Sequence, residues 1–213
     1  MKKVYFISGL GADKRAFSFL DLSFCEPLFV DWIKPEKRES LQQYALRLRQ
    51  TIPDKDPMVV GMSFGGMLAS EMARAECGVK AIIISSNKNS KEFPSFLRIG
   101  KYLPLYNWVP FSLLKRSQNV YSRIFGAKGS EQKKVLRQIV ADTDPQFVRW
   151  GIHSILHWKS EDKKANIIHI HGTADILLPF RLVKADYVIQ SGKHVMTLDQ
   201  HEEISPILKE LIQ

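Results

Sequence analysis

The segment Val59-Val60-Gly61-Met62-Ser63-Phe64-Gly65-Gly66 places a serine between two glycines, where an apolar run gives way to a helix-forming stretch. On a sharp turn from strand to helix the serine hydroxyl is exposed, and small residues two before and two after it let strand and helix approach closely. The N-terminus of the helix points backbone N–H groups toward the place where an oxyanion would form. The pattern predicts nucleophilic catalysis by Ser63, with the N–H of Phe64 as one oxyanion donor.

Two later segments could supply the base and the acid that a catalytic serine needs. A serine hydroxyl is a weak nucleophile until a histidine removes its proton, and an acid must fix the tautomer of that histidine. Asp175 follows the apolar run 167–171, at the carboxyl end of a predicted strand, where α/β sheets collect their sites. His194 follows the last strand signal in a loop that contains Gly192. We predict that Asp175 and His194 act with the serine.

Both of these residues have competitors. His201 lies seven residues after His194 and just before the acidic start of the last predicted helix. We expect it to belong to the turn that begins that helix. Asp199 is a weaker candidate than Asp175 for the acid. The alternative role for Asp175 is that of an ordinary turn residue.

Short apolar runs alternate with amphipathic segments along most of the chain. Runs that favour strands cover residues 3–8, 28–32, 57–62, 81–85 and 167–171, with a weaker signal at 186–189. Helical spacing of apolar residues covers 39–52, 64–77 and 202–212. Parallel strands need crossover connections, and these cover the faces of the sheet with helices. The order predicts the α/β class, with a mainly parallel sheet and helices on both faces.

Residues 90–161 interrupt this alternation. Their periodicity is helical, no strand signal appears, and four prolines divide the stretch. We predict an inserted helical lid at 90–161 on a core formed by 1–89 and 162–213. The early lid is rich in large apolar residues, which predicts a pocket that favours an apolar acyl or alcohol group, although packing of the lid on the core is an equal alternative for each residue. These residues are Phe93, Phe96, Leu97, Tyr102, Leu103, Leu105, Tyr106, Trp108, Val109 and Phe111.

The composition of the 213 residues favours a single domain, with 45% hydrophobic residues. The net charge of +9 is concentrated between residues 91 and 164, which hold fourteen Lys and Arg against six Asp and Glu. A solvated helical face is the expected role of these charges, and contact with a membrane surface or a nucleic acid is the alternative. Cys25 and Cys77 suggest neither a disulfide framework nor a metal site. With no signal-peptide core or membrane span evident, we expect a cytoplasmic protein; the oligomeric state is open.

The order Ser63, Asp175, His194, together with the serine turn, the Gly-Thr-Ala-Asp segment and the final Gly-x-His loop, resembles the α/β-hydrolase superfamily. The resemblance covers nearly the whole chain outside the lid, and it implies a sheet of about six strands with a helical cap. In that superfamily a second oxyanion donor lies in the loop after an early strand, which corresponds to the N–H of Leu10 here. Ser8 stands where that loop commonly has histidine.

Other chemistries fit the sequence less well. The segment Gly9-Leu10-Gly11 lacks the third glycine of a dinucleotide fingerprint, and a phosphate-binding Gly-Lys-Ser/Thr is absent. His169 and His171 alternate on a strand without further ligands at workable spacing, so satisfied strand histidines are expected there. His153 and His157 share a helical face and are expected to pack between lid and core. We predict neither a cofactor nor a metal ion.

The sequence therefore predicts a hydrolase that cleaves a carboxylic ester or thioester through an acyl-enzyme. The alternative is a ligand-sensing or signalling protein that keeps the scaffold with little or no turnover. The expected partner is a small-molecule substrate and not a nucleic acid. The bond that is cleaved and the identity of the substrate stay open, because similar constellations cleave esters, thioesters, amides, epoxides and carbon–carbon bonds.

Overall fold

The computed structural model of the protein describes residues 1–94, 100–102, 125–160 and 163–213. Six strands form one sheet in the order β2-β1-β3-β4-β5-β6, and every neighbouring pair is parallel. The strands are β1 (Lys3–Ile7), β2 (Glu26–Phe29), β3 (Met58–Met62), β4 (Lys80–Ile84), β5 (Ile167–Gly172) and β6 (Tyr187–Ile189). The predicted parallel sheet of about six strands is confirmed.

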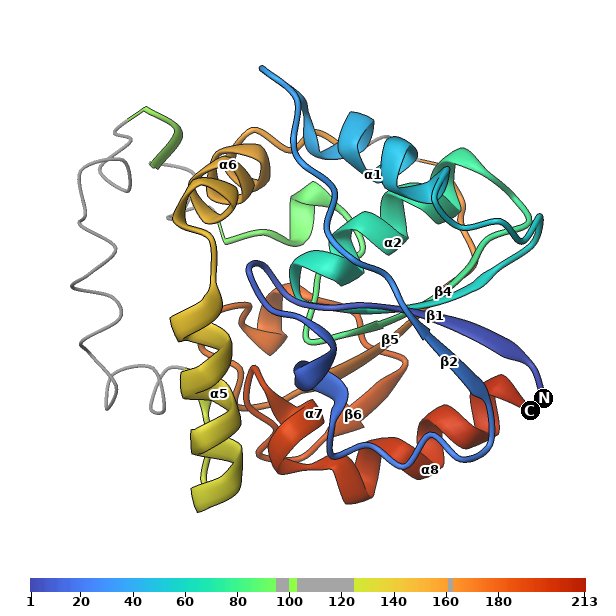
Figure 1. Cartoon of the computed structure of the whole chain (residues 1–213), viewed down its shortest axis with the longest axis vertical. Coiled ribbons are helices and arrows are strands. Elements are labelled where there is room, and N and C mark those ends of the chain that lie inside the picture. Colours follow the sequence, from blue (N-terminus) through green and yellow to red (C-terminus); the bar gives the residue numbers. More distant parts are fainter. Residues whose placement is uncertain (95–99, 103–124, 161–162) are drawn as a thin grey trace.

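Helices cover both faces of this sheet (Figure 1). On one face lie α1 (Leu41–Arg49) and α2 (Phe64–Ala75), and on the other lie the short helix η1 (Lys14–Phe17), α7 (Met196–Asp199) and α8 (His201–Ile212). Two shorter 3-10 turns are η2 (Ser90–Glu92) and η5 (Phe180–Leu182). The sheet is therefore the middle layer of three.

The pleat of each strand sends alternate side chains into two separate cores. In β1, Val4 and Phe6 pack into the cluster under α8 and η1, whereas Tyr5 and Ile7 pack into the cluster under α1 and α2. All four side chains are at most 5% exposed. Burial on both faces explains why the strands read as continuous apolar runs instead of alternating ones.

Two described helices of the predicted lid pack against opposite cores. Leu136 and Ile139 of α5 (Ser130–Asp142) join the core under η1 and α8, whereas Phe147 of α6 (Pro145–Leu156) joins the core under α1 and α2. Asp144 separates the helices and caps α6, accepting a hydrogen bond from the N–H of Gln146 at 2.8 Å. The pair thus connects the two cores. Residues 95–99, 103–124 and 161 of the predicted lid lie outside the described residues, so the division into core and lid stays a prediction.

The largest difference from the predicted strand boundaries is at β2, whereas the other strands agree to within one residue at each end. The run 28–32 was expected as a strand, but β2 covers Glu26–Phe29. Trp32 lies beyond the sheet, where its indole N–H donates to the carbonyl of Ala12 at 2.6 Å and its ring packs 5.0 Å from that of Phe147. Trp32 packs against a loop and a helix and is not part of the strand. Sequence periodicity cannot distinguish such a half-buried loop residue from a strand residue.

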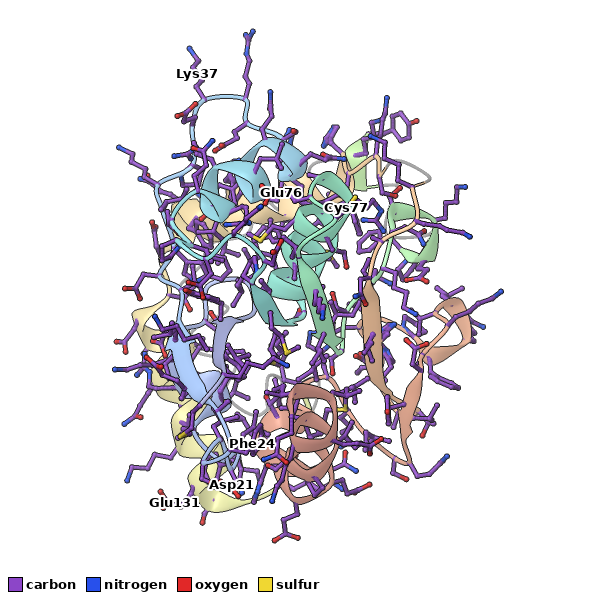
Figure 2. The ribbon with its side chains drawn as sticks, turned by 90° about the vertical axis from the view of Figure 1, so that its right-hand side faces the viewer. Asp21, Phe24, Lys37, Glu76, Cys77 and Glu131 are labelled. Carbon is purple, nitrogen blue, oxygen red and sulfur yellow. The ribbon has the colours of Figure 1, made fainter. Side chains whose placement is uncertain are left out.

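Figure 2 shows the side chains around this framework, with Lys37 on the loop before α1 and Cys77 just after α2. Cys77 is an exposed free thiol and Cys25 is a buried one. Among the described helices, none is long and apolar enough to cross a membrane.

Candidate active site

Ser63 occupies the turn between β3 and α2 in a backbone conformation that side chains rarely adopt, with φ 51° and ψ −117°. Such strain costs about 1–3 kcal/mol and persists only where the surroundings enforce it. Here the N–H of Ser63 donates to the carbonyl of Ile84 at 2.9 Å, and the hydroxyl of Ser86 donates to the carbonyl of Ser63 at 2.6 Å. The last residue of β4 and the segment just after it therefore hold the strained residue through both its N–H and its carbonyl. The role of Ser86 was not anticipated from the sequence.

The glycines around Ser63 are required by close backbone contacts. A Cβ atom on Gly61 would lie 2.4 Å from the carbonyl oxygen of Gly65, and one on Gly65 would lie 2.3 Å from the carbonyl oxygen of Ile7. A Cβ on Gly66 would lie 2.5 Å from the Ser86 hydroxyl oxygen. The first two contacts agree with the sequence argument, and the third explains a glycine that the motif does not include.

The structure brings Ser63, His194 and Asp175 together in a row. His194 Nε2 lies 2.8 Å from Ser63 Oγ, and His194 Nδ1 lies 2.8 Å from Asp175 Oδ2. The side chains of His194 and Asp175 are nearly inaccessible, since both residues are 4% exposed. A carboxylate on Nδ1 keeps the proton of a neutral imidazole there and leaves Nε2 free to accept the serine proton.

Asp175 is held by the loop that follows β5. Its second oxygen, Oδ1, accepts hydrogen bonds from the N–H groups of Leu177 at 2.9 Å and Leu178 at 3.0 Å. Burial alone would raise the pKa of Asp175, but the charge and hydrogen bond of His194, with the Leu178 N–H, outweigh it and lower that pKa below its usual value. The carboxyl group is therefore ionised at neutral pH.

Behind Asp175 lies a buried pair of histidines on β5. His171 Nε2 is 2.8 Å from the carbonyl oxygen of Leu178, and its Nδ1 is 2.9 Å from His169 Nε2. The Leu178 carbonyl can only accept, so His171 is protonated on Nε2 and His169 donates to its Nδ1. Burial lowers the pKa of both rings, that of His169 strongly. The pair stays neutral and fixes Leu178, which in turn holds Asp175.

The expected satisfied strand histidines are paired with each other, but only one side of the His169 ring is paired: Nε2 meets His171 Nδ1, and the buried Nδ1 has no hydrogen-bond partner among the described residues. The rings of His153 and His157 stack 4.1 Å apart on α6, with His153 exposed and His157 half-buried, and their packing between lid and core stays a prediction. Within the described residues, no group of three or more His, Cys, Asp and Glu is arranged to hold a metal ion.

The competing residues lie elsewhere. His201 is the first residue of α8, with its ring 5.7 Å from that of Phe19. Asp199 accepts a hydrogen bond from the N–H of Lys128 at 2.9 Å. Neither is recorded in contact with Ser63 or His194.

Leu10 and Phe64 border the same pocket as Ser63. Among the described residues, neither backbone N–H has a recorded hydrogen-bond acceptor. Phe64 is the first residue of α2, where N–H groups have no partner inside the helix. Ser8 donates its hydroxyl to the carbonyl of Ala12 at 2.7 Å and so closes the loop around Leu10.

A cavity of about 590 Å³ opens at Ser63 and His194. The size falls in the range of small-molecule sites. Apart from His194, its described lining residues include no ionisable side chain. Much of the wall comes from α5, α6, α7 and the loops after β5 and β6. The residues are Leu136, Ile139, Val140, Val148, Ile152, Ile155, Leu156, Leu177, Leu178, Val195 and Leu198.

Of the aromatic and aliphatic residues predicted for the early lid, Phe93 borders this cavity, whereas Tyr102 is 79% exposed. The other eight, Phe96, Leu97, Leu103, Leu105, Tyr106, Trp108, Val109 and Phe111, lie outside the described residues. The sequence argument did not anticipate how much of the wall α5 and α6 contribute.

No protein-family model matches this chain, and no curated protein sequence matches it. Solved structures do. The enol-lactonase from Burkholderia xenovorans LB400 superposes with a TM-score of 0.76 at 13% identity, over 98% of this chain and 90% of that one. The hydrolase olei00960 from Oleispira antarctica gives 0.73 at 15% identity, over 100% and 91%. A thermophilic esterase from Thermogutta terrifontis gives 0.72 at 12% identity, over 99% and 89%.

These likenesses extend over almost the full length of both partners in each comparison. They agree with the six-stranded parallel sheet and the helices that cover it. The chain has the α/β-hydrolase fold.

Proposed function

We propose that this protein is a serine hydrolase that cleaves carboxylic esters or thioesters of small molecules. The observation that carries the proposal is the unbroken hydrogen-bonded row from Ser63 through His194 to Asp175, at the floor of an apolar cavity. The names of the structural neighbours, an enol-lactonase and an esterase among them, support ester chemistry on this scaffold.

In the first half-reaction, His194 Nε2 takes the proton of Ser63 while Oγ attacks the carbonyl carbon of the substrate. The carbonyl oxygen becomes an oxyanion, which the N–H groups of Leu10 and Phe64 would hold. The bond to the leaving group then breaks, and His194 gives its proton to the departing alcohol or thiol. Asp175 stabilises the imidazolium in both steps without taking its proton.

In the second half-reaction, water replaces the leaving group. His194 takes a proton from water, the resulting hydroxide attacks the acyl-enzyme, and the proton returns to Ser63 Oγ as the acid leaves. The protein regains its starting state, and the sum is one ester and one water converted to one acid and one alcohol.

The substrate that fits this cavity has an apolar acyl or alcohol group. Aliphatic side chains of α5 and α6 make much of its described wall, and burying a methylene there is favourable by roughly 0.8 kcal/mol. A charged group in the cavity would lose its hydration without a partner of opposite charge among the described lining residues. Esters of longer alkyl acids should therefore be preferred over acetates until the cavity is filled.

The decisive test is Ser63→Ala assayed with p-nitrophenyl butyrate. We expect turnover to fall by about 10⁴-fold or more, because the loss of one residue of a catalytic triad removes nearly all of the rate enhancement that the three residues provide together. Ser18→Ala, at an exposed position after η1, is the matched control and should keep wild-type turnover. Equal turnover by Ser63→Ala and wild type would reject Ser63 as the nucleophile.

A fluorophosphonate probe separates the enzyme from a ligand-binding protein on the same scaffold. Rapid covalent labelling of wild type, lost in Ser63→Ala, is expected of an activated serine. Wild-type protein that is folded and remains unlabelled would favour the sensing function instead.

A further inference from the structure

The loop that carries Leu10 is a tight turn at the carboxyl end of β1. The N–H of Ala12 donates to the carbonyl of Gly9 at 2.9 Å, and Gly11 adopts a left-handed φ of 71°. A turn with positive φ at its third position is of type II, which suits glycine. Gly9 lies directly beside the nucleophile, since a Cβ atom on it would be 3.5 Å from Ser63 Cβ.

The carbonyl of Gly11 is bound by a residue far along the chain. Thr143, between α5 and α6, has its hydroxyl oxygen 2.7 Å from that carbonyl oxygen and 2.7 Å from the carbonyl oxygen of Ile139, so its one proton is shared between the two acceptors. The contact to Ile139 lies within one helical turn and needs no tertiary structure. The contact to Gly11 spans 132 residues and joins the helical insertion to the turn.

The side chain of Leu10 fits against a second part of the same insertion. A Cβ atom on Gly151, within α6, would lie 2.2 Å from Leu10 Cδ1. Glycine is unfavourable inside a helix, so its presence here needs a packing reason, and the close approach of Leu10 supplies one. A Cβ on Gly11 would likewise lie 2.5 Å from Thr143 Cγ2. Loop and insertion are therefore shaped to each other at two independent points.

We propose that Thr143 is a positioning residue for the oxyanion hole, acting through the carbonyl of Gly11 to set the direction of the Leu10 N–H. The inserted helices thus complete the catalytic site as well as bordering the substrate cavity. The inference rests on the proposed ester hydrolysis. It differs from it because Thr143 transfers no proton and forms no bond to the substrate.

Thr143 can act on the Leu10 N–H because a hydrogen bond joins two peptides of the turn. The Gly11 carbonyl belongs to the peptide that also carries the Ala12 N–H, and this N–H donates to the Gly9 carbonyl, which shares its peptide with the Leu10 N–H. Ser8 and Trp32 both bind the carbonyl of Ala12, at the end of the turn. Only the hydroxyl of Thr143, among the contacts given by the described residues, holds the carbonyl of Gly11.

The test compares Thr143→Val with Thr143→Ser. Valine keeps the shape of threonine and removes the hydroxyl, whereas serine keeps the hydroxyl. We expect Thr143→Val to lower kcat for p-nitrophenyl butyrate about tenfold with KM little changed, a fraction of the 10²–10³ lost with a whole oxyanion donor. Thr143→Ser should retain most of the wild-type kcat. Thr51→Val is the matched control, because Thr51 donates the same kind of hydrogen bond to Leu48 at 2.7 Å, at the end of α1.

Two further readouts separate positioning from general loosening. A boronic acid that forms a tetrahedral adduct on Ser63 should bind Thr143→Val about tenfold more weakly, while the rate of fluorophosphonate labelling in Thr51→Val stays unchanged. In ¹⁵N spectra of the free protein, the amide signals of Leu10 and Gly11 should move in Thr143→Val and not in Thr143→Ser.

Unchanged kcat, boronate affinity and loop amides in Thr143→Val would overturn the proposal, and so would equal losses in the valine and serine variants. If wild type hydrolyses no ester, the proposed function fails by itself. The amide signals then still decide whether Thr143 sets the turn.

Discussion

The two backbone segments proposed to hold the oxyanion are built in different ways. The turn at Ser63 is enclosed by strands β1 and β4 and by its own helix, with backbone carbonyls within 2.3–2.4 Å of any Cβ added at Gly61 or Gly65. On one side, the turn at Leu10 contacts the segment that contains α5 and α6. There the Gly11 carbonyl contacts the Thr143 hydroxyl, and the Leu10 side chain packs over Gly151. One is fixed by the sheet, and the other depends on two helices that the sheet does not require.

This difference separates stability from catalysis. Backbone atoms of a central sheet cannot move without disrupting the fold, whereas a side chain such as that of Leu10 can rotate. A change at the serine turn should therefore affect folding and activity together. A change at the interface of the Leu10 turn with α5 and α6 should affect activity far more than folding.

The largest effect is expected from Gly65→Ala. The new methyl group would lie 2.3 Å from the carbonyl oxygen of Ile7 and 2.4 Å from that of Ser8, so β1 or α2 must shift. We expect the free energy of unfolding in urea to fall by about 3 kcal/mol, in the range of overpacked cores. Turnover of p-nitrophenyl butyrate should fall with it.

Gly78→Ala is the matched control for that variant. The three atoms nearest to its new methyl group would all belong to Asp56, an exposed side chain that can rotate away. A change within about 0.5 kcal/mol is expected there. A loss equally small in Gly65→Ala would show that the serine turn is not confined as described.

A smaller effect, on activity alone, is expected from Gly151→Ala. The added methyl group displaces the Leu10 side chain and with it the turn, so kcat should fall about tenfold, equivalent to about 1.4 kcal/mol. Alanine is the better helix former by about 1 kcal/mol, which offsets the packing cost. Urea unfolding should therefore show little change in stability.

Gly129→Ala is the control within the same insertion. Gly129 precedes α5, and the added methyl group would meet only the Gln132 side chain. Its kcat should equal that of wild type. If Gly151→Ala kept full kcat, or lost stability as heavily as Gly65→Ala, the contrast between the two turns would be wrong.

The smallest effect is a pH dependence of the free energy of unfolding, and it comes from the buried histidine pair on β5. The pKa of His169 and of His171 is lowered by burial, whereas an unfolded histidine takes up its proton near about pH 6.5. Below that pH the unfolded chain binds more protons than the folded one, so the free energy of unfolding falls as the solution is acidified. Between pH 7 and pH 5 we expect a loss on the order of 1 kcal/mol, with the larger share from His169 because its pKa is lowered more strongly.

His169→Gln isolates this contribution. The glutamine amide can still donate toward His171 Nδ1 but does not ionise in this range. Urea unfolding at the two pH values should show a shallower dependence for His169→Gln than for wild type. Identical slopes for His169→Gln and wild type would contradict a neutral buried pair.

Most of the strands and the serine turn could be predicted, because their sequence signals lie within short windows. The apolar runs gave the strands to within a few residues, and the glycines around Ser63 marked the turn. Asp175 and His194 could be chosen because each follows a strand, and parallel strands end at a common edge. The supporting groups could not be chosen this way. Ser86 and His171 are ordinary strand-end residues in the sequence, and their partners lie on other segments.

By itself, the sequence determined the order of strands and helices, the serine turn, and the histidine and aspartate that form a row with Ser63, because periodicity, glycine spacing and strand ends are written within short windows. Only the tertiary structure decided that Thr143 binds Gly11, that Gly151 makes room for Leu10 and that α5 and α6 border the cavity. The first two contacts join residues more than 130 positions apart, and the partners are set by how helices pack, which no local pattern encodes.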